Sequence, residues 1–181
     1  GRTIGVSGQA DSEEGTAVLL VWCVARALVK EPRVNVNLVG DDIHMFRSAN
    51  IAVAIATDDG LYPATVYSAE SLSPQEIATK VAELSARATA GALTREDITG
   101  GTFTVSNLGM YGVSSFTAII NPPMGAILAL GRAQERVVVD NGAPVVATVV
   151  SATLSCDHRV IDGAVGAQFL QVLGAEIAAL G

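Results

Sequence analysis

The Asn141-Gly142 pair is the feature of the sequence that most restricts the fold. It separates two runs of β-forming residues, 136–140 and 145–154, and Asn-Gly between such runs is typical of a tight β-hairpin. The second run leads through a short polar loop into residues 164–180, whose apolar side chains fall largely on one helical stripe. Hairpins combined with helices indicate an α+β fold and argue against a doubly wound nucleotide-binding fold.

Earlier segments predict the rest of a single domain. Residues 73–76 (Ser-Pro-Gln-Glu) form a capping box with proline at the first helical position, and Gly91 marks the end of that helix. Residues 16–28 are apolar nearly all round, which predicts a buried helix. Strands are expected at residues 34–38, 43–46, 51–56, 62–67, 102–105 and 126–130. We expect one domain over residues 16–181, preceded by a loosely attached segment at residues 1–15.

The composition indicates a chain that buries surface against other chains. Half of the 181 residues are hydrophobic and only 16% are charged, which is unusually apolar for a soluble monomer. The longest apolar run, residues 17–25, is too short to cross a bilayer, so no membrane partner is expected. The net charge is −7 and the only lysines are Lys30 and Lys80, which excludes a basic stripe for nucleic acid. The surplus apolar surface therefore predicts contacts between subunits.

The two cysteines, Cys23 and Cys156, lie within apolar segments and lack the spacing of metal ligands. They are expected to be buried thiols in a reducing compartment, and no metal site is predicted. Cys156 stands two residues before His158, so it is also an alternative candidate nucleophile. No group that would stabilise an oxyanion is visible beside it.

His158 is the best candidate for a general base, because it lies in a loop between a predicted strand and a predicted helix. A single loop histidine can also be purely structural. Asp162, just before the helix, is expected to cap it. His44 is the only other histidine and is interpreted as structural. Ser106 ends a predicted strand ahead of a glycine-containing turn, where its hydroxyl could face a site.

Two stretches resemble one known family. Residues 157–163 (Asp-His-Arg-Val-Ile-Asp-Gly) are similar to the DHRxxDG signature of the dihydrolipoamide acyltransferases, the core subunits of 2-oxo acid dehydrogenase complexes. Residues 100–112 (Gly-Gly-Thr-Phe-Thr-Val-Ser-Asn-Leu-Gly-Met-Tyr-Gly), followed by residues 116–123, resemble a second stretch of the same family in the expected order. The resemblance runs from about Leu28 to the C-terminus.

The resemblance implies a chloramphenicol-acetyltransferase-like fold, a mixed β-sheet flanked by helices, assembled as a homotrimer with active sites between subunits. Trimers of the family stack further into hollow cores of 24 or 60 chains. The implied substrates are coenzyme A, or acetyl-CoA, and a lipoyl group supplied by another domain or chain. The implied partners are lipoyl domains and other subunits of a pyruvate dehydrogenase type of complex, in the bacterial cytoplasm or the mitochondrial matrix.

By the same resemblance, His158 is the general base that takes the proton of the thiol, and Ser106 donates a hydrogen bond to the oxyanion. Asp162 corresponds to a residue whose salt bridge holds the active-site loop. Ser106, Asn107 and Gly109 are further expected to line the channel of the thiol substrate. Residues 107–112 favour acetyl as the acyl group.

The sequence also departs from the family. The catalytic domain of the family normally carries about fifty more residues at its N-terminus, including the arginine that pairs with the aspartate at position 162. Neither a lipoyl domain nor a subunit-binding domain is recognised. Two alternatives therefore remain, a non-catalytic core subunit with the same fold and a free-standing acetyltransferase of small molecules.

Overall fold

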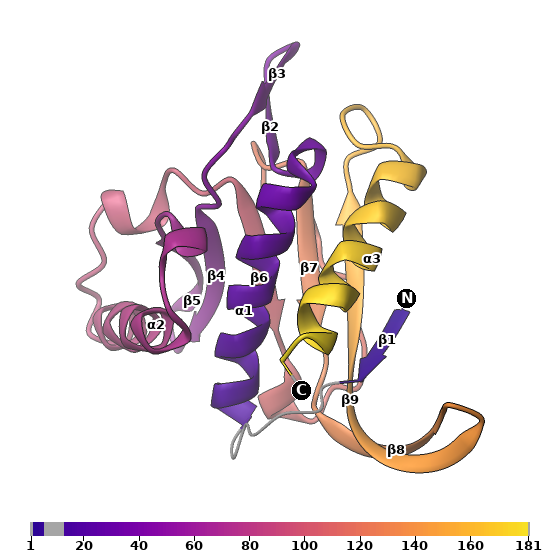
Figure 1. The fold of residues 1–181 in the computed structure, drawn as a ribbon. Helices are drawn as coiled ribbons and strands as arrows, with labels where there is room; N and C mark the ends of the chain where they lie inside the picture. The colour runs from indigo at the N-terminus through magenta and orange to yellow at the C-terminus, as the bar shows by residue number, and fades with distance from the viewer. Residues whose placement is uncertain (1, 6–12, 181) are drawn as a thin grey trace.

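The protein is a mixed β-sheet with helices packed on it, and the computed structural model describes residues 2–5 and 13–180 (Figure 1). The helices are α1 (Glu13–Lys30), α2 (Pro74–Thr89) and α3 (Gly163–Ala178). The strands are β1 (Arg2–Gly5), β2 (Val36–Val39), β3 (Asp42–Met45), β4 (Ile51–Thr57), β5 (Gly60–Val66), β6 (Phe103–Asn107), β7 (Ala126–Leu130), β8 (Gln134–Asp140) and β9 (Ala143–Cys156). Four short 3-10 turns, η1 (Pro32–Val34), η2 (Ala69–Ser71), η3 (Glu96–Ile98) and η4 (Gly109–Tyr111), complete the described elements.

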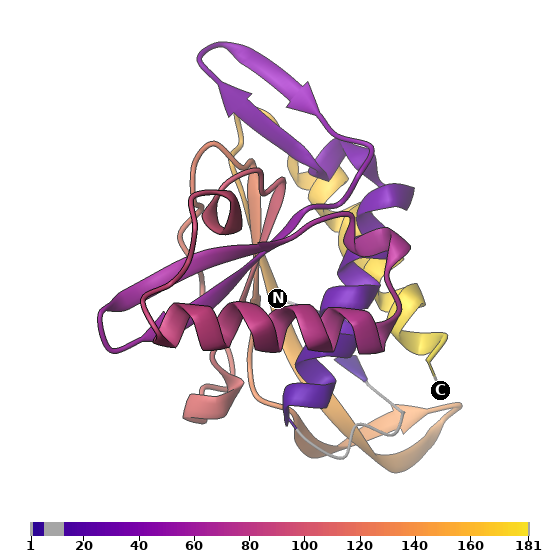
Figure 2. The same ribbon diagram turned by 90° about the vertical axis from the view of Figure 1, so that its left-hand side faces the viewer.

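The main sheet has the order β1-β9-β7-β6-β4-β5, and β8 pairs with the remaining length of β9. Strand β6 runs parallel to both β4 and β7, whereas the β4–β5 and β8–β9 pairs are antiparallel hairpins. The predicted combination of hairpins with helices in an α+β fold is therefore confirmed. Strands β2 and β3 form a separate two-stranded sheet that projects from one end of the molecule (Figures 1 and 2).

Helices α1 and α3 lie side by side over the sheet, and α2 packs against α1, β4 and β5 (Figures 1 and 2). The core is formed where these helices meet the sheet. There the ring of Phe103 on β6 lies 5.5 Å from the ring of Phe169 on α3, and both side chains are fully buried. None of the described helices is long and apolar enough to span a membrane.

A buried charge joins α1 to α3. The carboxylate of Glu176 on α3 is 7% exposed and accepts hydrogen bonds from Arg26 (2.6 Å to Nε) and from the ammonium group of Lys30, both on α1. Burial raises the pKa of Glu176, but the hydrogen bonds from Lys30 and Arg26 outweigh it and hold that pKa below its ordinary value. The guanidinium of Arg26 also lies 4.7 Å from the centre of the Trp22 ring.

The predicted helix cap at Ser73 and the predicted turn at Asn141-Gly142 are both present in the structure. The capping box of Ser73 is complete, with both reciprocal hydrogen bonds to Glu76, and Asn141 and Gly142 both have positive φ in the β8–β9 turn. Residues 1–15 divide differently from the prediction. Residues 2–5 pair with β9 as β1, and α1 begins at Glu13. The prediction of a loosely attached segment remains for residues 6–12, which lie outside the described residues.

Candidate active site

His158 lies in the loop that joins β9 to α3, and its backbone neighbours fix this loop to the body of the protein. The N–H of Asp157 donates to the carbonyl of Gly125 at 2.8 Å, and the carbonyl of Asp157 accepts from the N–H groups of Val160 and Ile161 at 3.0 Å. The side chain of Ile161 is buried in the core. The imidazole of His158 is exposed, and no described residue hydrogen-bonds to it. A histidine presented in this way is available to a substrate.

Asp157 and Arg159 flank His158 and bind each other. The carboxylate of Asp157 accepts from the backbone N–H of Arg159 at 3.0 Å, from its Nε at 3.0 and 3.1 Å, and from its Nη2 at 2.6 Å. The side-chain and backbone hydrogen bonds from Arg159 lower the pKa of Asp157 to about 2. No role was predicted for this pair, although the opposite charges on either side of the histidine are visible in the sequence.

Asp162 is the N-cap of α3, as predicted, and its Oδ1 accepts from the N–H of Val165 at 2.8 Å. None of the described residues forms an ion pair with it. Arg33 is close enough for the charge of Asp162 to contribute to the raised pKa of its guanidinium, but Arg33 pairs with Glu31 at 2.6 Å. The salt bridge implied by the resemblance therefore remains a prediction.

The side chain of Cys156 faces α3. Its Sγ lies toward Gly166 on α3, 3.5 Å from where a Cβ at that glycine would be, and burial raises the pKa of its thiol to about 11. Burial likewise raises the pKa of Cys23 to about 12. A thiol with a raised pKa carries little thiolate near neutral pH and is a poor nucleophile. The structure therefore gives no support to Cys156 as the nucleophile.

Ser106 lies on β6 between β4 and β7, and its side chain is almost buried. Because successive strand residues alternate between faces, Ser106 points away from the face on which Phe103 meets α3. Asn107 takes the opposite direction, and its Oδ1 accepts from the N–H of Gly109 at 2.8 Å, which closes a tight turn. Asn107 and Gly109 border a small cleft beside the start of α1, together with Arg132. Their role in a substrate channel remains a prediction.

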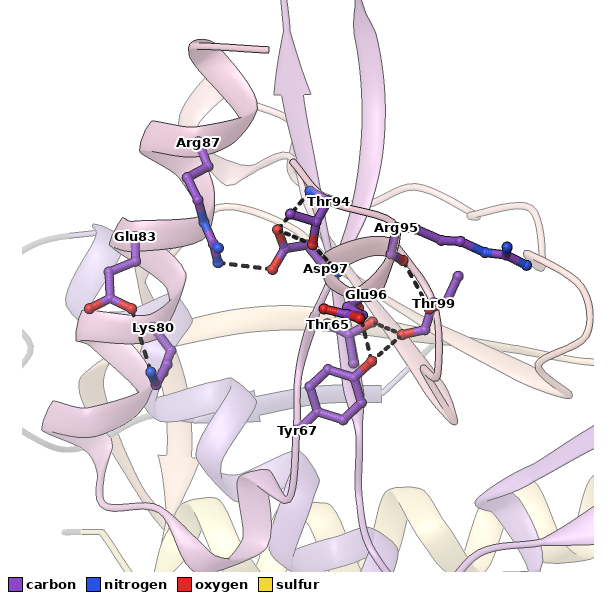
Figure 3. Close-up of polar contacts among 10 residues, drawn as sticks. All are labelled: Thr65, Tyr67, Lys80, Glu83, Arg87, Thr94, Arg95, Glu96, Asp97 and Thr99. Atoms are coloured by element: carbon purple, nitrogen blue, oxygen red, sulfur yellow. Dashed lines mark hydrogen bonds and ion pairs between the residues drawn. The ribbon is translucent and has the colours of Figure 1, made fainter. Parts of the chain in front are cut away.

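The segment that leads into β6 is held by a polar cluster (Figure 3). The carboxylate of Asp97 accepts a hydrogen bond from the backbone N–H of Thr94 at 2.8 Å and forms an ion pair with Arg87 of α2 at 2.9 Å. The hydroxyl of Tyr67 donates to the carbonyls of Glu96 and Thr99, at 2.9 Å in each case. These contacts hold residues 94–99, which lead through Gly100 into β6, the strand that carries Ser106.

Ser106 and His158 lie at opposite ends of the sheet. Ser106 is in the same row as Ala129 on β7 and Thr153 on β9, so two strand spacings, about 10 Å, separate Ser106 from β9. From Thr153, β9 continues to Cys156, about 10 Å further, before the loop of His158 begins. One chain therefore does not bring these two predicted site residues together.

His44 lies exposed on β3, opposite Asn37 of β2. Within residues 2–5 and 13–180, no three His, Cys, Asp or Glu side chains gather closely enough to hold a metal ion. The structural interpretation of His44 remains a prediction.

The fold agrees with comparisons to known proteins. Residues 7–179 match the family model described as 2-oxoacid dehydrogenases acyltransferase (catalytic domain). The chain belongs to this acyltransferase family. A solved relative, a probable dihydrolipoamide acetyltransferase from Listeria monocytogenes, superposes with a TM-score of 0.92 at 30% identity, covering 99% of this chain and 83% of that one. Chloramphenicol acetyltransferase, at 14% identity and a TM-score of 0.57, shares the fold. The predicted fold class is confirmed.

Among curated members of the acyltransferase family, the acetyltransferase component of the pyruvate dehydrogenase complex of Rickettsia felis is 42% identical over 151 residues. The match covers 83% of this chain and 37% of that protein. Mitochondrial component 2 of Arabidopsis thaliana is 46% identical over 156 residues, covering 84% of this chain and 29% of that protein. The chain thus spans about a third of the length of the curated relatives that it matches.

Proposed function

We propose that this chain forms the core of a dihydrolipoamide acetyltransferase, which transfers an acetyl group between dihydrolipoamide and coenzyme A. The observation that carries the proposal is a shared spacing. The structure of the Azotobacter vinelandii dihydrolipoamide acetyltransferase addresses a serine, a histidine and an asparagine in its catalytic mechanism, and it aligns with 98% of this chain at a TM-score of 0.89 and 27% identity. Those three residues follow one another at the same intervals as Ser106, His158 and Asp162 do here.

The chemistry needs a base and a hydrogen-bond donor. His158 takes the proton from the thiol of one substrate, and the resulting thiolate attacks the carbonyl carbon of the other substrate's thioester. Ser106 donates its hydroxyl hydrogen bond to the oxygen that becomes negative in the tetrahedral intermediate. The intermediate then breaks its bond to the leaving sulfur, which takes the proton back from His158. Both acidic residues near His158 already have partners, so its imidazole is left for the thiol.

Such a site forms between two copies of the chain, one supplying His158 and the next supplying Ser106. Exposed valines support this assembly. Val137 and Val146 face each other in the β8–β9 register, with Val139 on the same side, and these three side chains are 71%, 68% and 77% exposed. An apolar strand face of this kind is expected to be covered by another subunit. A homotrimer, and a larger core built from trimers, is the assembly that we propose.

The names of similar proteins suggest the partners of this chain and the compartment in which it works. One solved relative is the cubic core of the pyruvate dehydrogenase multienzyme complex, with a TM-score of 0.85 and 33% identity over 90% of this chain and 68% of that one. We infer that lipoyl domains of such a complex supply the dihydrolipoamide, and that coenzyme A is the second substrate. Bacterial and mitochondrial relatives favour the bacterial cytoplasm or the mitochondrial matrix.

The test is acetyl transfer from acetyl-CoA to dihydrolipoamide. His158→Ala is expected to lower the rate by about 10²–10⁴, and Ser106→Ala by about 10²–10³. Co-assembling the two inactive variants then restores activity, since about a quarter of the interfaces in a random mixture combine a native serine with a native histidine. If activity is not recovered, both residues of a site must come from the same chain. An inactive but well-assembled wild type would favour the non-catalytic core subunit.

A further inference from the structure

The loop of His158 contains a closed ring made by its two neighbours in sequence. Asp157 and Arg159 are joined by four contacts of 2.6 to 3.1 Å, which include both carboxylate oxygens and the backbone N–H of Arg159. An arginine fork on a carboxylate fixes orientation as well as distance. The ring therefore spans the peptide units on both sides of His158 and limits the directions that its side chain can take.

Outside this ring, the described hydrogen bonds of the loop hold the residues around His158 but not His158 itself. The backbone of Asp157 is held by Gly125 on one side and by Val160 and Ile161 on the other. No described backbone group bonds to the N–H or carbonyl of His158. The orientation of His158 thus depends on the contact between its neighbours.

We propose that Asp157 and Arg159 are positioning residues, which together hold His158 in the direction required to reach the substrate thiol at the interface with the neighbouring subunit that supplies Ser106. This inference rests on the proposed function, because only a proton-transferring His158 needs such a device. The pair also occupies the carboxylate of Asp157, the residue next to His158 in the sequence.

Stability alone does not account for the pair. The side chain of Arg159 is 74% exposed, and exposed ion pairs add little to the free energy of folding. A displacement of about 1 Å in a catalytic group can cost about 100-fold in rate. Loss of the pair is therefore expected to affect turnover much more than folding.

The experiment compares Asp157→Ala, Asp157→Asn and Arg159→Gln in the acetyl-transfer assay. Asp157→Ala and Arg159→Gln are expected to lower kcat by about 10- to 100-fold, with KM for both substrates and the melting temperature unchanged. Asp157→Asn should fall between Asp157→Ala and the wild type, because its amide oxygen can still accept from the N–H groups of Arg159. The matched control is Glu83→Gln, which removes an exposed ion pair with Lys80 on α2 and is expected to leave kcat unchanged.

The outcomes separate the two proposals. A wild type and Glu83→Gln protein that both lack activity would overturn the proposed function, and this inference with it. An active wild type with an equally active Asp157→Ala variant would overturn the positioning role alone. A rise in KM for acetyl-CoA at constant kcat in Arg159→Gln would also overturn it, because Arg159 would then bind substrate rather than orient His158.

Discussion

Ser106 lies at the carboxyl end of β6, whereas His158 lies beyond the carboxyl end of β9, which runs antiparallel to β7, the strand next to β6 in the sheet. The two residues therefore sit at opposite ends of one sheet, although both belong to stretches that resemble a single enzyme family. A reaction that uses both must draw them from different chains. Oligomer formation then becomes a condition for activity.

Val139→Glu tests this condition. The change places a charge on the apolar face of the β8–β9 hairpin, where Val139 is 77% exposed in one chain. Burial of an unpaired charge against a neighbour costs several kcal/mol, so the oligomer should dissociate and activity should fall by tenfold or more. Sedimentation and the transfer assay measure the two effects. Lys80→Glu on α2 is the control, and a Val139→Glu protein that is monomeric yet fully active would refute the shared site.

Substitutions at Asp162 should distinguish its role as a helix cap from a role that needs its negative charge. Its Oδ1 caps α3 by accepting from Val165, and asparagine caps a helix about as well as aspartate does. Asp162→Ala should therefore lower the free energy of unfolding by about 0.5–2 kcal/mol, while Asp162→Asn should leave it nearly unchanged. Urea denaturation measures both. A large loss of activity in Asp162→Asn at full stability would indicate the salt bridge of the family, and equal destabilisation by both changes would contradict the capping role.

Glu176 should make the packing of α1 on α3 sensitive to acid. Its pKa is lower in the folded protein than its ordinary value of 4.5, so its contribution to stability is fully present above that value. That contribution is lost as the pH falls through the folded pKa. Glu176→Ala should lower the free energy of unfolding at neutral pH by about 1.5–3 kcal/mol, the range for hydrogen bonds to charged groups. Melting curves from pH 3 to 7 should show a smaller acid-induced decrease in this variant than in the wild type, and parallel curves would refute the assignment.

Cys156→Ala tests whether the nucleophile is the substrate thiol, activated by His158, or the thiol of Cys156. Because the thiol is partly buried toward α3 and its pKa is raised to about 11, it should not take part in acyl transfer. The variant is expected to keep kcat within about threefold of the wild type, since the change removes only a partly buried sulfur atom that faces α3. A loss comparable to that of His158→Ala, with unchanged melting temperature, would instead restore Cys156 as a nucleophile.

Local signals in the sequence were sufficient for most elements but not for their assembly. The Asn141-Gly142 turn and the Ser73 capping box depend only on neighbouring residues, so both could be predicted. The pairing of β1 with β9 could not, because four residues at the start of the chain find partners near residue 150. The opposite positions of Ser106 and His158 depend on strand order in the same way. The direction of Cys156 required the pleat of β9, which fixes which face each side chain takes.

Gly100→Ala should show how strictly the entry into β6 is fixed. Gly100 has a φ of +72°, and a Cβ there would lie 2.8 Å from the hydroxyl oxygen of Tyr67, which is anchored by its hydrogen bonds to Glu96 and Thr99 (Figure 3). The alanine therefore adds a clash to the cost of a left-handed backbone, which is about 1–3 kcal/mol. Gly40→Ala, in the β2–β3 turn, is the matched control.

Gly40 has a φ of +63° but open space around the added Cβ, so its substitution carries the backbone cost alone. Gly100→Ala should be the more destabilising of the two in urea denaturation. It should also lower acetyl transfer, because movement of the Tyr67 cluster displaces the strand that carries Ser106. Equal destabilisation by the two alanines, with full activity retained, would mean that Tyr67 yields freely and that the cluster does not position β6.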